Sequence, residues 1–139
     1  MQFQPIPDIQ RALVEKFYRA HRSPMRTKGN GQIWIAKDRE IVGAMSLRTV
    51  EDGHWLTGLF VAPEKRAQGI ARDLIEAAMA SVEGPVWLFC EPELTQFYQR
   101  LGFVVSEDLP QELVARLARY RQTRMLIALQ HDRAGLRSV

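Results

Sequence analysis

The sequence has one cysteine and no apolar run that approaches the length of a membrane span. The single thiol, Cys90, cannot close an internal disulfide, and its place at the end of an apolar run predicts a small buried side chain in a reducing compartment. A membrane-spanning helix needs about 20 apolar residues. Because the N-terminal residues also show no signal-peptide pattern, we expect a cytoplasmic protein without a membrane partner.

Two common phosphate-binding motifs are missing as well. The chain has no Gly-x-x-x-x-Gly-Lys-Ser/Thr string, which a Walker A loop requires, and no Gly-x-Gly-x-x-Gly string, which marks dinucleotide-binding folds. Both nucleotide-binding interpretations therefore lose their main support. We also expect no metal site.

The apolar content is sufficient for one hydrophobic core. Of the 139 residues, 46% are hydrophobic and 25% are charged, and a chain of this length buries about two-thirds of its unfolded surface. We expect a single domain over residues 1–139, with 130–139 as a basic tail. The net charge is +3, and the arginines after Pro110 are Arg116, Arg119, Arg121, Arg124, Arg133 and Arg137. A solvated helix face and a basic tail explain these arginines better than a nucleic-acid surface does.

Helical and strand periodicities alternate along the chain. Helical spacing is expected over 8–21, 69–82, 93–101 and 110–121, and strands over 32–36, 40–50, 54–61, 86–90, 103–106 and 124–129. The first three strands form an antiparallel meander. A helix joins the third strand to the fourth, which predicts that these two are parallel neighbours. The segment 22–31, rich in turn formers and cations, is expected to be a mobile loop.

The most informative segment runs from Leu59 to Met79. An apolar strand stops at Pro63, a short charged turn follows, and an amphipathic helix begins at Gly69. The first N–H groups of a helix have no intrahelical acceptor and lie at the positive end of the helix dipole. A strand, a glycine-containing turn and a helix start in this order therefore predict a phosphate site, to which Arg66 adds a positive charge.

This segment resembles the pyrophosphate-binding signature of the GNAT N-acetyltransferase superfamily. The resemblance lies in Arg66-x-x-Gly69-x-Ala71, where the family has Arg/Gln-x-x-Gly-x-Gly/Ala. A second segment, Phe97-Tyr98-x-x-x-Gly102-Phe103, is similar to the Phe-Tyr-x-x-x-Gly-Phe string that the family carries after its fifth strand. Together with the strand end from Leu59, the two motifs and the elements between them cover about 45 residues, in the element order of the family. The family often has Asn and Ala where this chain has Glu91 and Leu94.

The resemblance implies an α/β fold of mixed α+β type. Its centre would be a mixed, largely antiparallel sheet of about six to seven strands, flanked by about four helices. The fourth and fifth strands of the family splay apart, and an acyl-CoA binds in the notch between them. The expected coenzyme-binding residues are Leu59, Phe60, Val61, Arg66, Ala67, Gln68, Gly69, Ile70, Ala71 and Arg72. Backbone groups of the first three would pair with the pantetheine arm, and the amides of 68–72 would bind the pyrophosphate.

The implied reaction is direct attack of a primary amine, on a small molecule or peptide, on the thioester of acetyl-CoA. The backbone N–H of Phe60 would stabilise the oxyanion, and Tyr98 would protonate the departing CoA thiolate as a general acid. The base is His54 or Glu51 in the first instance. Asp52, Glu91 and a water relay stay open.

Two other functions remain. A non-catalytic acyl-CoA-binding sensor would keep the phosphate turn without turnover, and an aminoacyl-tRNA acetylating toxin would use the arginine-rich last third. The identity of the amine and the preferred acyl chain are not written in the sequence, although the cations of 22–31 hint at an acidic group on the acceptor. Exposed sheet edges make a homodimer an open alternative.

Overall fold

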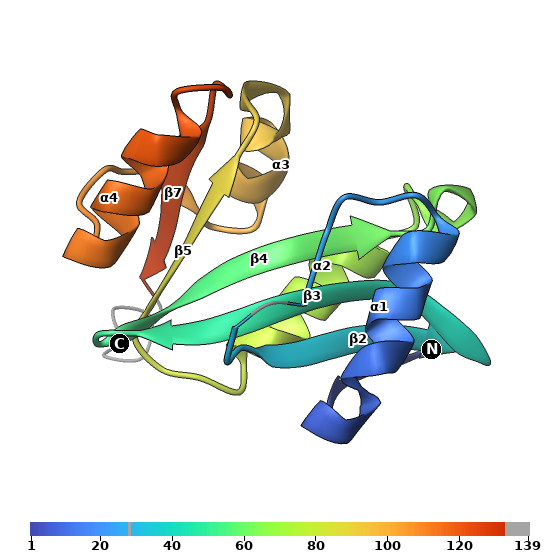
Figure 1. Ribbon diagram of the computed structural model, residues 1–139. Coiled ribbons are helices and arrows are strands. Elements are labelled where there is room, and N and C mark those ends of the chain that lie inside the picture. Colours follow the sequence, from blue (N-terminus) through green and yellow to red (C-terminus); the bar gives the residue numbers. More distant parts are fainter. Residues whose placement is uncertain (28, 133–139) are drawn as a thin grey trace. The chain divides into compact units, whose positions relative to one another are not determined.

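The computed structural model describes residues 1–27 and 29–132. This part of the chain contains seven strands and four α-helices (Figure 1). The strands are β1 (Gln2–Ile6), β2 (Gln32–Asp38), β3 (Glu40–Val50), β4 (Gly53–Val61), β5 (Pro85–Cys90), β6 (Val104–Val105) and β7 (Ile127–Asp132). The helices are α1 (Arg11–Ala20), α2 (Ile70–Met79), α3 (Thr95–Arg100) and α4 (Gln111–Tyr120), and 3-10 turns cover Asp8–Gln10, Pro63–Lys65 and Pro92–Leu94.

The strands pair in the order β1-β2-β3-β4-β5-β7-β6. Pairing is antiparallel for β1 with β2, β2 with β3, β5 with β7 and β6 with β7. Between β4 and β5 it is parallel and short, joining His54 to Val86 and Trp55 to Trp87. The predicted α/β fold with a mixed, largely antiparallel sheet is therefore confirmed, including the parallel neighbours. A splay between β4 and β5 stays a prediction.

By its internal contacts the chain divides into two compact units. The first comprises residues 1–48 and 56–82, and the second comprises 49–55 together with the described residues from 83 to 132. The boundary falls inside β4, after Trp55, so this strand contributes to both units. The expectation of a single domain over 1–139 stays a prediction.

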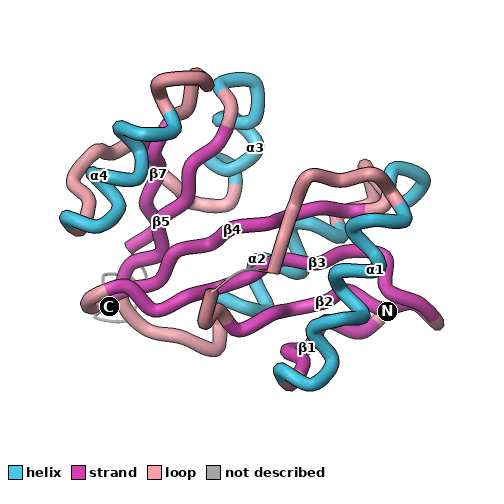
Figure 2. Tube along the Cα trace, viewed as in Figure 1, coloured by secondary structure: helices cyan, strands magenta, loops and turns pink. Residues whose placement is uncertain are grey.

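In the first unit α1 and α2 cover opposite faces of the strands, with α1 in front and α2 behind in Figures 1 and 2. Phe17 and Tyr18 of α1 belong to the cluster on one face, and Ile70 of α2 belongs to the cluster on the other. Successive residues of a strand point to opposite faces. Phe60 accordingly packs with the α1 cluster and Val61 with the α2 cluster.

All three tryptophans are buried in strands. The exposed fractions of Trp34, Trp55 and Trp87 are 7%, 8% and 4%. In the second unit the indole Nε1 of Trp87 donates to Gln130 Oε1 at 3.1 Å, and the Arg116 guanidinium lies 4.9 Å from the centre of the Trp55 ring. These contacts are those of core residues, so the three rings do not form an aromatic cage.

Cys90 is also buried at the end of β5, as expected. Burial is the main cause that raises the pKa of its thiol, which keeps the group in the unreactive protonated form. The interpretation of Cys90 as a small apolar side chain is confirmed.

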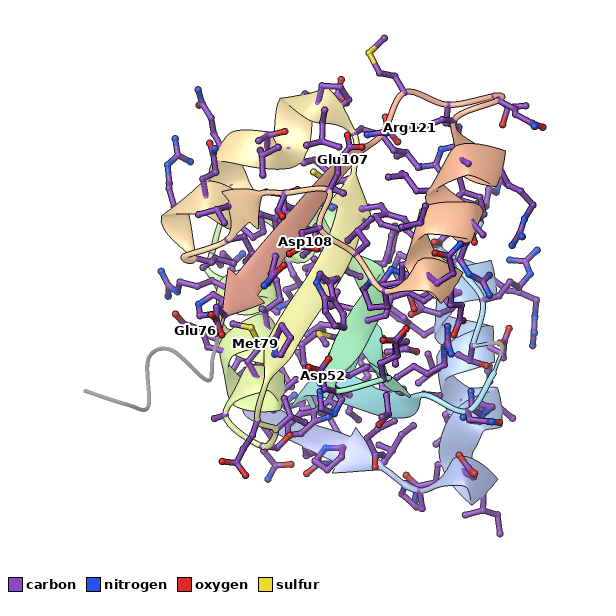
Figure 3. All side chains as sticks on the ribbon, turned by 90° about the vertical axis from the view of Figure 1, so that its left-hand side faces the viewer. Asp52, Glu76, Met79, Glu107, Asp108 and Arg121 are labelled. Atoms are coloured by element: carbon purple, nitrogen blue, oxygen red, sulfur yellow. The ribbon has the colours of Figure 1, made fainter. Side chains whose placement is uncertain are left out.

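The last strand begins later than the sequence predicts. The chain is still turning at Arg124, whose N–H donates to the carbonyl of Tyr120 at 3.0 Å, so β7 starts at Ile127 and not at 124. Arg121 fixes this turn: its Nη2 donates to the Leu126 carbonyl at 2.9 Å and to Glu107 Oε2 at 3.0 Å, and Figure 3 shows Glu107 and Arg121 side by side. The Arg121 guanidinium thus determines where the strand can begin.

β7 also ends later than predicted, at Asp132, so residues 130–132 of the expected basic tail belong to a strand. Their partners on β5 are Trp87, Val86 and Pro85. The remainder of the expected tail, 133–139, lies outside the described residues.

The expected mobile loop 22–31 is tied to α1 at the residues described. The Glu15 carboxylate accepts hydrogen bonds from the N–H and the hydroxyl of Thr27, the former at 2.7 Å. Arg11 donates to the carbonyl oxygens of Thr27 and Gly31. The hydrogen bond from Thr27 is the main cause that lowers the pKa of Glu15. Side chains of α1 thus hold the middle and the C-terminal end of a segment that the sequence predicts to be mobile.

Candidate active site

The turn between β4 and α2 has two residues in the left-handed conformation. After the 3-10 turn Pro63–Lys65, Ala67 has φ 63° and Gly69 has φ 81°. A left-handed conformation costs a residue with a Cβ about 1 to 2 kcal/mol, and glycine adopts it freely. The strain at Ala67 and the glycine at 69 together turn the backbone so that α2 starts immediately after Gly69.

The amides of this turn have no backbone acceptor among the described residues. The N–H groups of Lys65 and Arg66 are used by the 3-10 turn, and the first hydrogen bond of α2 runs from Asp73 N–H to the Gly69 carbonyl at 3.0 Å. The amides of 67–72 lie between these bonds, and no side chain caps the helix. Together with the helix dipole they form a concave set of donors suited to an anion.

Two arginines flank these amides, each in a different way. Arg72 is 53% exposed and ion-paired with Asp73 at 3.1 Å, and its guanidinium lies against Gly69. It can swing onto a phosphate. Arg66 points back toward β4: its Nε donates to the Val61 carbonyl at 2.9 Å and its guanidinium lies 5.1 Å from the Phe60 ring centre. Arg66 therefore holds the end of β4 as well as adding charge to the turn.

The hydrogen bond that the Val61 carbonyl accepts from Arg66 affects how a coenzyme could pair with the end of β4. The Val61 oxygen already accepts this bond, but a carbonyl oxygen has two lone pairs and can accept a second donor. The N–H of Ala62 donates to Val42 of β3 at 2.8 Å. Pairing of a ligand with β4 over Leu59, Phe60 and Val61 stays a prediction.

β4 contains a left-handed glycine three residues before its end. Gly58 has φ 70°, which interrupts the extended backbone of the strand in the manner of a bulge. Its carbonyl accepts a hydrogen bond of 2.6 Å from the hydroxyl of Tyr18 in α1. The sequence analysis missed Tyr18. A tyrosine on an apolar helix face needs a hydrogen-bond partner for its hydroxyl when it is buried, but the neighbouring sequence does not identify that partner.

A comparison with known protein families shows which family this fold and the amide-lined turn match. The model of the acetyltransferase (GNAT) domain matches residues 29–105, which is more than half of the chain. The chain belongs to the GNAT acetyltransferase family. This match contains β2 to β6 and the whole amide-lined turn, so the family resemblance predicted from the sequence is confirmed.

Solved structures agree with this assignment at low sequence identity. The protein Rv2747 of Mycobacterium tuberculosis, in complex with CoA and NLQ, matches with a TM-score of 0.70 at 13% identity, over 95% of this chain and 99% of that one. ElaA of Escherichia coli matches with 0.68 at 14% identity, over 95% and 100%. A comparison with the curated proteins found no match.

An N-acetylglutamate synthase of Neisseria gonorrhoeae is also similar in fold. Its structure, complexed with coenzyme A and N-acetyl-glutamate, matches with a TM-score of 0.64 at 16% identity, over 96% of this chain and 35% of that one. At these identities the structures establish the GNAT fold and not the substrate.

The second unit holds the predicted general acid, Tyr98 of α3. The side chain is 6% exposed, and its ring packs against Phe97 and Phe103 with centroids at 5.0 and 5.9 Å. Burial raises the pKa of the Tyr98 phenol well above its usual value, and Cys90 adds to this. The phenol therefore stays protonated at neutral pH, as a general acid must. Its catalytic role stays a prediction.

The predicted bases lie around the start of β4. Glu51 and Asp52 form the exposed turn before the strand, and His54 is its second residue. Burial lowers the pKa of His54, and its Nδ1 is buried without a hydrogen-bond partner in the described part of the chain. Glu91, the fourth candidate, is ion-paired with Arg124 at 3.4 Å.

His21 at the end of α1 is a proton acceptor that the sequence analysis missed. Its Nδ1 lies 3.1 Å from the Phe17 carbonyl, which can only accept, so Nδ1 carries the hydrogen and Nε2 has the lone pair. Nε2 faces Glu64 Oε1 at 4.0 Å, and the imidazole ring packs 5.9 Å from the Phe60 ring. Nε2 therefore faces a carboxylate beside the Phe60 ring.

A cavity of about 410 Å³ opens between α1 and the strands of the first unit. Buried residues such as Ile6 and Ile35 make its lining apolar, while Lys16, Lys37 and Arg39 contribute positive charge and Glu40 and Glu64 contribute negative charge. None of the three cations is ion-paired with a described residue. The cavity has the size and lining that suit a small molecule with an apolar body and polar or charged groups.

No helix in 1–27 or 29–132 is long and apolar enough to cross a bilayer. Over the same ranges, no three His, Cys, Asp or Glu side chains cluster as metal ligands do.

The lowered pKa of His54 predicts a pH dependence of stability. Its folded pKa lies below the unfolded value near 6.5, so the stability that depends on neutral His54 is present above that value and is lost as pH falls through the folded pKa. We expect Tm to fall between pH 7 and pH 5 more steeply in the wild type than in His54→Gln. Calorimetry at both pH values measures this, with His21→Gln as the matched histidine control. Equal Tm losses in wild type and His54→Gln would show that His54 is not the group responsible.

Proposed function

We propose that this protein is an N-acetyltransferase that moves the acetyl group of acetyl-CoA to a primary amine by direct attack. The observation that carries the proposal is the set of unpaired amides at 67–72, between two arginines, in a chain of the GNAT family. A diphosphate is the anion whose size and charge match this set. The coenzyme A bound in the structures of similar fold supports the same donor.

The reaction needs one bond to form and one to break. The amine nitrogen attacks the thioester carbon, the carbonyl oxygen becomes an oxyanion, and the C–S bond then breaks to release CoA. The N–H of Phe60 is the proposed oxyanion donor, and such donors are worth about 3 kcal/mol each. Tyr98 is proposed to give its proton to the leaving thiolate.

The attacking amine must first lose a proton, because an alkylamine with a pKa near 10 is only about 0.1% neutral at pH 7. We propose that His54 or Glu51 takes up this proton through a chain of waters. The distance is too long for direct transfer, because each precedes Phe60 by six or more residues and a strand rises about 3.3 Å per residue. His21 joins them as a candidate, since its Nε2 lies 4.0 Å from Glu64 Oε1 and its ring packs beside the Phe60 side chain. Replacing each of the three by its neutral counterpart, with kcat measured against pH, separates them: only loss of the true base removes the acidic limb of the profile.

Thiol release from acetyl-CoA across a panel of amines tests the function. The panel pairs amines that carry a carboxylate with their amides, because Lys16, Lys37 and Arg39 would favour an acidic acceptor. It also includes peptides with free N-termini and charged tRNA. We expect amine-dependent release of one CoA per acetylated product. Tight CoA binding without any amine-dependent release would instead establish the non-catalytic sensor, and acetylation of charged tRNA with steep salt dependence would establish the toxin.

A further inference from the structure

The Tyr18 side chain is fully buried, and its hydroxyl has a backbone carbonyl of β4 as hydrogen-bond partner. The side chain is 0% exposed, and its hydroxyl donates to the Gly58 oxygen at 2.6 Å. The two residues lie 40 positions apart in the sequence. A hydroxyl in an apolar cluster loses its water contacts, so this one bond must satisfy it.

The Gly58 carbonyl that accepts the Tyr18 hydrogen bond belongs to the same peptide unit as the Leu59 N–H. Gly58 is left-handed at φ 70°, so its carbonyl departs from the alternation of a regular strand. A trans peptide is planar, and its C=O and N–H point in opposite directions. The Tyr18 bond to the Gly58 carbonyl therefore also fixes the direction of the Leu59 N–H, which points away from Tyr18.

The aromatic surroundings hold the Tyr18 hydroxyl in place. The Phe60 ring packs edge-on against Tyr18 with centroids 6.5 Å apart, and against Phe17 at 5.8 Å. The Arg66 guanidinium lies 5.1 Å from the Phe60 ring centre, and its Nε donates to the Val61 carbonyl. β4 is thus held at two carbonyls, Gly58 and Val61, on either side of Leu59 and Phe60.

We propose that Tyr18 is a positioning residue of acetyl transfer: through the Gly58 carbonyl it orients the Leu59 N–H, a backbone donor in the part of β4 proposed to meet the thioester. This rests on the proposed function. Tyr18 does not touch the reacting atoms and exchanges no proton, since burial, aided by Glu15, raises the pKa of its phenol. Its contribution is to hold this donor and the peptide that precedes Phe60 in place before the charge on the oxygen develops.

The test is Tyr18→Phe, which removes the oxygen and keeps the ring among Phe17 and Phe60. We expect kcat to fall about tenfold, the effect of one neutral hydrogen bond, with KM for acetyl-CoA changed less than about twofold. The backbone amide resonance of Leu59 should shift, because its peptide plane is no longer fixed. Val14→Ala is the matched control: it truncates another fully buried side chain of α1 in the same cluster and leaves the Gly58 bond intact.

Gly58→Ala provides the second variant. A Cβ at this position would meet the Tyr18 hydroxyl at 3.1 Å and would strain a backbone at φ 70°. It should lower kcat by itself, and the double variant with Tyr18→Phe should lose less than the product of the two single effects, since both act on one contact.

The outcomes separate the positioning role from the function. If the wild type turns over and Tyr18→Phe keeps its kcat, or Val14→Ala loses as much kcat at a similar Tm, the positioning role is wrong and the acetyltransferase stands. If the wild type consumes no acetyl-CoA with any amine, both are wrong. A selective loss of kcat with an unchanged KM and a shifted Leu59 amide supports the proposal.

Discussion

Gly69→Glu is expected to weaken binding of CoA at least about 100-fold. The new carboxylate would sit at the mouth of the amide-lined turn, where it repels the diphosphate and competes for the N–H groups of 67–72. Hydrogen bonds to a charged group are worth about 1.5 to 3 kcal/mol each, and a tenfold change in affinity corresponds to about 1.4 kcal/mol, so losing two of them suffices. Calorimetric titration of the folded variant with CoA measures the loss.

Two control variants separate the effect of a negative charge at residue 69 from the effect of an added side chain there and from that of a charge elsewhere on α2. Gly69→Ala adds a Cβ at φ 81°, against the mobile end of Arg72, without adding charge. It should lose far less affinity, because strain of about 1 to 2 kcal/mol is spread over a flexible side chain and an exposed turn. Ala80→Glu adds the same charge at the exposed C-terminal end of α2 and should leave CoA affinity nearly unchanged.

A truncated ligand gives the sharpest check of where the affinity is lost. Pantetheine has the amide-rich arm of CoA but no diphosphate, so its binding should be the same in the wild type and Gly69→Glu. Retention of CoA affinity within about threefold in a folded Gly69→Glu variant would overturn the phosphate role of this turn and, with it, the proposed donor substrate.

The turn could be predicted from the sequence because its cause is local. A strand that ends at Pro63, a glycine at 69 and the start of an amphipathic helix are all visible within about ten residues, and free amides follow from any helix start. The orientation of Arg66 could not be predicted in this way. Its bond to Val61 depends on the path of the intervening 3-10 turn and on the Phe60 ring, which the spacing of the motif does not encode.

The hydrogen bond from Tyr18 to Gly58 shows more clearly which contacts could not be predicted from the sequence. The two residues are 40 positions apart, and Tyr18 occupies a helix position that apolar packing alone would explain. A glycine inside a strand pattern is a general sign of a bulge, which makes Gly58 the half of the pair that sequence could suggest. The strand β7 began late for a related reason: its start is set by the bonds of Arg121 to Leu126 and Glu107, which no strand periodicity contains.

Tyr98→Phe is expected to lower kcat about 10- to 100-fold, because a positioned general acid contributes about 10² to 10⁴ and a thiolate is a better leaving group than most. One observation on Tyr98 is consistent with this role. Burial raises the pKa of the phenol above its usual value, so the group is protonated at neutral pH and has a proton to give.

The pH profile and a second tyrosine make this prediction specific. Because the pKa of Tyr98 lies above its usual value, the wild-type kcat should show no alkaline loss up to about pH 9, whereas ionisation of an ordinary tyrosine begins near there. Tyr120→Phe is the matched control, since Tyr120 is also partly buried in the second unit and packs on Phe89 at 6.4 Å. Steady-state release of CoA at saturating amine measures kcat for both. If Tyr98→Phe retains the wild-type kcat and pH profile, or if Tyr120→Phe loses as much, then Tyr98 is a packing residue and the thiolate leaves without an acid.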